Sequence, residues 1–323
     1  MIAFPIRLHR MTRRALFILN PTAAAGRAAG DLDRVRSLLP PLGIAATFRE
    51  SQATGHAVEL ARAAAESGAF DVIVAAGGDG TAREVASGVL GSGAATTPVA
   101  VLPLGTGNDL AHVAGTSRLP VALQAIAASV VRPMDAIAVT CEIGGRTGIT
   151  HAMSFAAVGL AADVVRYTTP SVKRWFGPRL CYSVGFFRAL VRYRPVSASV
   201  VCDGREVRDD FLLICAGNTT HAGGQIMHLS PGADAHDGEL NVSLIRAANR
   251  LEVALQFVRL LRGTHIRHRR ASYFKGRGTD VRTERPAEVQ LDGDIIGTTP
   301  ACFRIMPGAL RLVVGSTPTR ARM

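Results

Sequence analysis

Aromatic side chains are scarce in this chain of 323 residues, where Phe, Trp and Tyr together make up 5% and tryptophan occurs once. Hydrophobic residues still amount to 48%, so Ala, Val and Leu must fill any core. No stretch of 18 apolar residues occurs, which argues against a transmembrane helix. The apolar segment at the N-terminus is too short for a signal peptide. We therefore expect a cytoplasmic protein, with room for peripheral contact at the inner face of the membrane.

Paired cysteines are also missing, which excludes the common zinc-binding and dithiol motifs. The five cysteines form no Cys-x-x-Cys pair and show no spacing typical of metal ligands. A protein of this kind is expected to keep its thiols reduced and to use them as small core residues. The cysteines are Cys141, Cys181, Cys202, Cys215 and Cys302.

Acidic residues are in the minority, with 25 Asp and Glu against 37 Lys and Arg, which gives a formal net charge of +12. Such a balance favours an acidic partner: nucleic acid, an anionic membrane or a polyphosphate. Much of the excess lies between residues 259 and 285, where Tyr273 and Phe274 are the only aromatic residues. Proteins that bind single-stranded nucleic acid use aromatic stacking platforms, so nucleic acid is the less favoured partner. A solvated basic face remains the alternative interpretation.

Strand and helix patterns alternate through the first part of the chain and then give way to strand patterns. The alternation predicts an N-terminal, Rossmann-like, parallel α/β nucleotide-binding domain over residues 1–136. Residues 137–323 carry period-2 or fully apolar runs separated by turns, which predict a mainly antiparallel β-sandwich domain. Helices are expected within this second domain at 183–193 and 251–263. Strands are expected in the first domain at 15–20, 45–50, 71–77 and 99–105, and helices at 28–39, 56–68, 81–90 and 121–131.

Polar, glycine-rich turns follow three of the predicted parallel strands, where sheets of this kind bind ligands. They read NPTAAAG (20–26), GGDGT (77–81) and GTGND (105–109). Glycines let a ligand approach the backbone, and amides at a helix start can hold a phosphate. The GGDGT turn has no lysine, and its Asp79 would repel a phosphate unless Mg²⁺ or a Mg²⁺-bound water lay between them. A plain turn that starts a helix is the alternative.

The GTGND turn repeats this pattern one strand later and places Asp109 at the start of a helix. Helix capping alone would explain an aspartate at this position. Two such turns on successive parallel strands, however, bring two carboxylates to the same edge of the sheet. The pair is less readily explained as two independent caps.

Four motifs in order resemble the diacylglycerol kinase catalytic domain family, which includes bacterial lipid kinases and the sphingosine and ceramide kinases. The resemblance extends over about residues 13–316 and implies an ATP-dependent, Mg²⁺-requiring transfer of the γ-phosphoryl group to a lipid hydroxyl, as in diacylglycerol or a sphingoid lipid. GGDGT alone also occurs in NAD kinases, so an NAD kinase is one alternative. A non-catalytic nucleotide- or lipid-binding homologue is another, and a homodimer is possible in each case. The motifs are NPTAAAG, GGDGTAREV, PLGTGNDLA and VQLDGDIIG.

The resemblance also implies which residues would contact ATP and metal. Asp79, Asp109 and Asp135 would form an acidic network with Mg²⁺-bound water at the phosphoryl site. A structural Mg²⁺ would be held by the side chain of Asp237, and by Asp234 and Glu239 through backbone carbonyls. The remaining nucleotide-binding positions would be Asn20, Gly26, Ser51, Gly77, Gly78, Gly80, Thr81, Glu84, Thr106, Gly107 and Asn108.

The family's catalytic Asp-Gly-Glu motif reads Asp292-Gly293-Asp294 in this chain. One carboxylate would accept the proton of the lipid hydroxyl, and the second would orient the base or the metal network. The shorter Asp294 leaves open which of the two acids is the base. A two-residue hairpin turn, for which Asp-Gly is a leading signal, is the alternative interpretation. Arg83 stands where family members usually carry asparagine, and is expected to reach a phosphate.

Overall fold

The first part of the chain folds into a parallel sheet in the computed structural model, which describes residues 12–21, 28–93 and 96–315. Its strands lie side by side in the order β2-β1-β3-β4, and every pair among them is parallel. This arrangement confirms the parallel α/β character expected for the region. The strands are β1 (Arg13–Leu19), β2 (Ile44–Glu50), β3 (Val72–Gly77) and β4 (Val99–Pro103).

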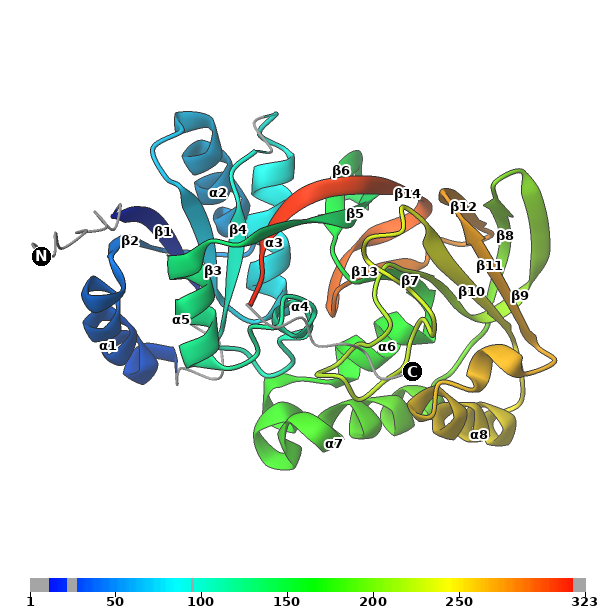
Figure 1. The fold of residues 1–323 in the computed structure, drawn as a ribbon. Helices are drawn as coiled ribbons and strands as arrows, with labels where there is room; N and C mark the ends of the chain where they lie inside the picture. The colour runs from blue at the N-terminus through cyan, green and yellow to red at the C-terminus, as the bar shows by residue number, and fades with distance from the viewer. Residues whose placement is uncertain (1–11, 22–27, 94–95, 316–323) are drawn as a thin grey trace, which may run out of the picture.

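Helices cover both faces of this sheet (Figure 1). Successive residues of a strand point to opposite faces, so Phe17 packs with Leu123 of one helix layer and Ile18 packs with Val85 of the other. One layer contains α1 (Ala28–Leu38), the short η2 (Pro40–Leu42) and α5 (Leu119–Ala128). The opposite layer contains α2 (His56–Ser67), α3 (Asp79–Leu90) and α4 (Asp109–Val113).

The second part of the chain forms antiparallel strands that close on themselves. The pairing runs β9-β7-β13-β14-β12-β8 and returns to β9, and β10, β11, β5 and β6 extend this ring. Alternate side chains point inward and form one core, including Phe211 and Phe303. The β-rich domain expected from the sequence is therefore present. Its strands are β5 (Val131–Ile143), β6 (Arg146–Ala152), β7 (Phe155–Gly159), β8 (Val196–Cys202), β9 (Arg205–Gly217), β10 (Leu240–Arg246), β11 (Ala271–Gly276), β12 (Gly278–Thr283), β13 (Glu288–Leu291) and β14 (Asp294–Val313).

The strand β14 belongs to both parts of the molecule. Its middle packs in the β-rich core through Phe303, whereas Leu310 and Leu312 pack in the core of the α/β part. Leu312 also pairs in parallel with Val99 of β4. The chain therefore crosses between the two parts twice, through β5 and back through β14. The end of β14, which lies within the expected second domain of 137–323, packs in the first part of the molecule.

Three helices pack on the outer face of β7, β9 and β10, on the side of the molecule where α7 and α8 are labelled in Figure 1. They are α6 (Leu160–Tyr167), α7 (Pro170–Val191) and α8 (Arg250–Leu261), and η3 (His265–Arg267) follows α8. The helix α6 falls in a segment for which no helix was expected. The helix α7 starts well before residue 183 and bends at Gly177, where φ is +68°. Within the described residues, no helix has the length and apolar character needed to cross a membrane.

Candidate functional site

Two glycine turns meet at the carboxyl ends of β3 and β4. A Cβ on Gly105 would lie 2.3 Å from the Cα of Gly78, so the two backbones approach more closely than any side chain would allow. The Asn108 side chain closes its own turn by accepting from the N–H of Gly105 at 2.9 Å and donating to its carbonyl. The glycines are therefore required for contact between the turns, whether or not a ligand is present.

This contact brings together the two acids that start α3 and α4. The N–H of Leu110 donates to Asp79 at 3.4 Å, and Asp109 accepts from the backbone of Gly224 and Gln225 at 3.0 and 3.1 Å. Burial, together with the charge of Asp109, raises the pKa of Asp79 to about 7. Burial likewise raises the pKa of Asp109. The two carboxylates thus lie in a setting that disfavours two uncompensated negative charges and favours a cation.

Asp292 lies at a hairpin turn between β13 and β14. Asp292 and Gly293 both have positive φ, +48° and +95°, as a two-residue turn of this kind requires. The Asp292 carboxylate accepts three backbone N–H groups, from Met153 at 2.7 Å and from Ser154 and Phe155 at 2.9 Å. Burial raises the pKa of Asp292 despite these donors. Asp-Gly can therefore be both a hairpin turn and part of a functional site, because the turn fixes the position of the Asp292 carboxylate.

Asp294 faces the other way, toward the GGDGT turn. Its carboxylate lies 3.2 Å from the guanidinium of Arg83, which is buried, while Asp294 itself is about half exposed. A Cβ on Gly80 would lie 2.7 Å from the same carboxylate. Arg83 was expected to reach a phosphate, and in this structure it pairs with the second acid of the Asp-Gly-Asp motif.

A groove of about 780 Å³ runs along this side of the α/β part. Such a volume is typical of small-molecule sites, which measure roughly 300–1,000 Å³. The N-terminus of α3 opens onto it, as in anion-binding sites. Its lining includes five residues expected to contact nucleotide, together with Arg83 and Asp294: Asn20, Ser51, Gly80, Thr81 and Glu84.

Several expected nucleotide contacts make internal contacts or lie elsewhere. Glu84 accepts the N–H of Gly55 at 3.0 Å, and the Ser51 hydroxyl donates to the carbonyl of Leu19 at 3.1 Å. Gly77 packs closely against Thr81: a Cβ on Gly77 would lie 2.4 Å from the threonine hydroxyl. Thr106 and Gly107 belong to the second turn, where Thr106 is exposed. Gly26 lies outside the described residues.

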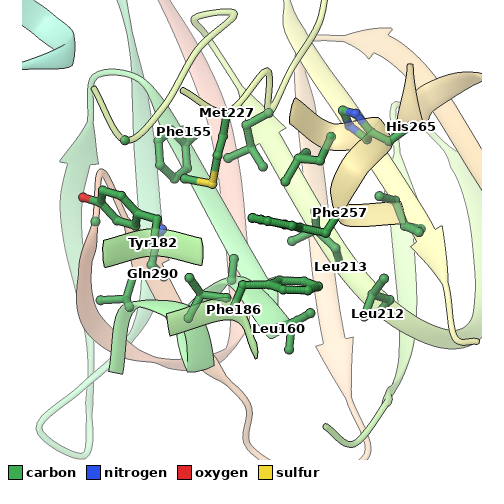
Figure 2. A pocket seen from close by; sticks show the side chains of 18 of the residues that line it. Phe155, Leu160, Tyr182, Phe186, Leu212, Leu213, Met227, Phe257, His265 and Gln290 are labelled. Carbon is green, nitrogen blue, oxygen red and sulfur yellow. The ribbon is translucent and has the colours of Figure 1, made fainter. Parts of the chain in front are cut away.

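A second, apolar cavity of about 100 Å³ begins at the acids and extends under the helices. Asp79, Asp109 and Asp292 all line it. Figure 2 shows Tyr182 and Gln290 on one side of this cavity and His265 on the other, with Phe257 between them. No Lys or Arg is found among the described residues that line it. Its apolar walls include Phe155, Leu160, Phe186, Leu213, Met227 and Phe257.

Asp135, which was expected in the same network as Asp79 and Asp109, contacts a different set of backbone groups. Its carboxylate accepts the N–H groups of Gly238 and Gly308, each at 2.7 Å. Gly308 lies in β14 where the register with β5 shifts. Asp135 therefore ties together the strands that cross between the two parts of the molecule.

The acidic residues at 234–239, which were expected to hold a structural Mg²⁺, contact other protein groups in this structure. The Lys275 ammonium lies 3.0 Å from Asp237 and 3.3 Å from Glu239, so a lysine supplies the positive charge there. Asp234 accepts the N–H of His236 at 3.1 Å within its own turn. Across the part of the chain that the structure describes, no cluster of three or more His, Cys, Asp or Glu residues has a metal-binding arrangement.

Comparison with known proteins agrees with this architecture. Residues 14–139 match the family model of the diacylglycerol kinase catalytic domain, and residues 154–314 match the model of the YegS C-terminal NAD kinase beta sandwich-like domain. The chain belongs to the diacylglycerol kinase catalytic domain family. Its relatives are named as kinases, and the resemblance stated from the four motifs is thereby confirmed.

Individual relatives cover nearly the whole chain at modest identity. The diacylglycerol kinase of Bacillus subtilis (strain 168) is 27% identical over 90% of this chain and 93% of its own. A Pseudomonas putida protein named "Probable lipid kinase YegS-like" is 28% identical over 93% of this chain and 95% of its own. A solved structure of a diacylglycerol kinase from Bacillus anthracis (strain Sterne) has a TM-score of 0.66 at 18% identity, covering 95% of this chain and 98% of that one. The last comparison shows a shared fold.

Sequence reasoning missed the parts of the site that come from unremarkable segments. The N–H donors to Asp292 come from residues 153–155, and Gln225 also donates its side-chain amide to Asp109 at 3.3 Å. Neither role has a local sequence signal, because each depends on a partner more than 100 residues away. The apolar cavity had one available signal, the amphipathic pattern of 251–263.

Proposed function

We propose that this family member is an ATP-dependent lipid kinase that transfers the γ-phosphoryl group to a hydroxyl of a lipid such as diacylglycerol. The observation that carries the proposal is that the GGDGT turn and the Asp-Gly-Asp hairpin each line both sites. Gly80 and Asp294 line the groove, whereas Asp79 and Asp292 line the apolar cavity together with Asp109. The groove suits a nucleotide, and the apolar walls of the cavity suit the hydrocarbon next to a lipid hydroxyl. A lipid held there presents its hydroxyl to the acids.

Asp292 is the proposed proton acceptor. A carboxylate has about four acceptor sites, and the three backbone donors leave one for the acceptor hydroxyl. Its raised pKa also brings it closer to the pH at which a general base is most effective. Asp294, on the nucleotide side, would orient Arg83 and the phosphate groups next to it.

Asp79 and Asp109 would hold Mg²⁺, bound with its water, near the transferring group. The donor set fits this role, because two buried carboxylates with raised pKa values lie on either side of Gly107: a Cβ there would be 2.6 Å from Asp79 and 3.8 Å from Asp109. Mg²⁺ keeps several waters and uses one or two carboxylates in phosphoryl-transfer sites, which agrees with the lack of a three-acid cluster in the described residues. When bound, the ion would offset charge on the phosphates.

An NAD kinase, the main alternative, fits the acceptor side less well. A dinucleotide carries a pyrophosphate, and the cavity walls supply no Lys or Arg side chain among the described residues to bind it. Burial also lowers the pKa of His265 in this cavity to about 4, so it is neutral at physiological pH. These properties favour an uncharged, apolar acceptor.

A cavity-filling substitution tests the proposal. Leu213→Trp adds a large side chain inside the cavity, whereas Leu38→Trp adds the same group on the exposed side of α1. We expect Leu213→Trp to lower lipid phosphorylation by at least about tenfold while ATP still binds, because overpacking blocks the acceptor rather than the nucleotide. The Leu38 variant should behave as wild type. Equal lipid turnover by both variants would contradict an acceptor site in this cavity.

A further inference from the structure

The outer faces of α7 and α8 expose an unusual concentration of large apolar side chains. Trp175 is 83% exposed, Leu251 is 73% exposed and Leu255 is 57% exposed. Single exposed apolar residues are ordinary, but a contiguous patch marks an interaction surface. The docking face, as we call this surface, consists of Trp175, Phe176, Leu180, Phe187 and Val191 of α7 and Leu251, Leu255 and Val258 of α8.

Six of these residues form two stripes of helical period, while Trp175 and Phe176 precede the bend of α7 at Gly177. Leu180, Phe187 and Val191 are spaced seven and four residues apart on α7, and Leu251, Leu255 and Val258 are spaced four and three apart on α8. Such spacing places each set on one side of its helix. The two helices are packed together, with Phe187 of α7 in an edge contact with Phe257 of α8. The stripes therefore belong to one surface.

The same two helices are apolar on their inner sides as well. Phe186 of α7 and Val253 and Phe257 of α8 line the apolar cavity. Apolar residues on two sides of a helix favour contacts on both sides, yet the outer stripes of α7 and α8 face solvent. Some partner must therefore cover them, and the cavity behind them points to what that partner is.

Charge on and beside the docking face selects an anionic partner. The α7 segment contains no Asp or Glu. The one acid of α8, Glu252, is held by Arg270 at 2.8 Å. Exposed arginines flank the apolar stripes, and among the described residues none of them forms an ion pair with a carboxylate: Arg188, Arg192, Arg250, Arg259 and Arg262.

We propose that the docking face is the surface by which this protein binds an anionic lipid bilayer, so that the acceptor lipid enters the cavity between α7 and α8. Stable peripheral binding takes two signals, an apolar insertion and a basic patch, and this surface has both. Each arginine near an anionic bilayer adds to the attraction between the protein and the bilayer. The proposal rests on the lipid-kinase function for the entry route, but membrane binding itself can be measured without catalysis.

The protein supplies its own probe, because its single tryptophan, Trp175, is exposed near the start of α7. Vesicles of phosphatidylcholine with phosphatidylglycerol should shift its fluorescence emission to shorter wavelength, as the indole leaves water. Vesicles of phosphatidylcholine alone should shift it less, and added salt should weaken the effect by screening. No shift with anionic vesicles, for a protein that is folded, would overturn the proposal.

A pair of matched variants localises the binding. Leu251→Glu with Leu255→Glu places charge on the docking face, whereas Ile149→Glu with Leu38→Glu does so elsewhere. Ile149 and Leu251 are both 73% exposed, and Leu38 is less exposed than Leu255, at 39% against 57%, so the control pair burdens folding at least as much. We expect the first pair to lower co-flotation with anionic vesicles by at least about tenfold and the second to leave it unchanged, since a charged side chain opposes insertion. Equal loss in both pairs would overturn the assignment.

Activity separates this proposal from the proposed function. The docking-face pair should lose phosphorylation of diacylglycerol embedded in vesicles but keep that of a short-chain diacylglycerol dispersed in water. Vesicle binding by a protein that phosphorylates neither substrate would uphold the docking face and contradict the kinase function. Phosphorylation of both substrates without vesicle binding would uphold the kinase function and contradict the docking face. A wild-type dimer that the same pair converts to monomer, without any vesicle binding, would show that a second copy covers this face.

Discussion

Replacing Asp292 by asparagine separates the structural role of this acid from its catalytic one. The carboxylate accepts three N–H groups, and an amide can keep two of them, from Ser154 and Phe155. Its NH₂ group must then face the N–H of Met153, which now donates at 2.7 Å. One charge-assisted hydrogen bond is lost and two donors meet, at a cost of about 1–3 kcal/mol.

This cost is small against the stability of a typical domain, about 5–15 kcal/mol, so most of the variant remains folded. Loss of a general base, in contrast, lowers the rate by about 10²- to 10⁴-fold. The kcat for lipid phosphorylation at saturating ATP should therefore fall far more than the folded fraction does. Titration calorimetry shows whether the variant still binds ATP, and the melting temperature shows how much stability it has lost.

Asp135→Asn is the matched control, because Asp135 also accepts backbone N–H groups but lies among the strands that cross between the two parts of the molecule. It should lose comparable stability and keep kcat within about twofold once corrected for folded protein. The reasoning is refuted if Asp292→Asn keeps more than about a tenth of the wild-type kcat. It is equally refuted if both variants lose activity in parallel.

Two further predictions concern the other acids. Burial and the charge of Asp109 raise the pKa of Asp79 from 3.8 to about 7, so the folded protein binds the proton of Asp79 more tightly than the unfolded chain does. Protonated Asp79 therefore contributes to stability below about pH 4, and this contribution is lost as the pH rises through about 7. The melting temperature of Asp79→Asn minus that of wild type should therefore increase between these pH values in nucleotide-free protein, and a constant difference would contradict the pKa shift. Arg83→Asn and Asp294→Glu should each lower kcat/KM, and the double variant should lose less than the sum, with a coupling of about 0.5–3 kcal/mol. Strict additivity would show that the 3.2 Å pair does not act as a unit.

The parts of the structure that sequence alone predicted well are those with local causes. The strand–helix alternation fixed α1, α2 and α5 to within a few residues, because each combines an apolar face with a nearby glycine or proline stop. The hairpin at Asp292-Gly293 followed from the turn chemistry of Asp-Gly. Such signals depend on neighbours within a few positions.

What sequence could not provide depends on contacts between distant segments. Asp135 looked equivalent to Asp79 and Asp109, yet the loops at 238 and 308 capture its carboxylate. The basic stretch of 259–285 was noted for its charge and given no strand, although β11 and β12 take up much of it. The early part of α7 was hidden by Gly177 and two prolines, which break the local helical pattern but are accommodated by a bend.

The central claim is transfer of phosphate from ATP to a lipid hydroxyl, and a labelling experiment tests it most directly. Purified protein would be incubated with γ-labelled ATP and Mg²⁺, and offered diacylglycerol, a lipid extract or NAD in parallel. Our account predicts label in the lipid phase, with Asp292→Asn reduced to near background, and no label in NADP. Label in NADP alone, or none in any lipid from folded protein that binds ATP, would contradict it.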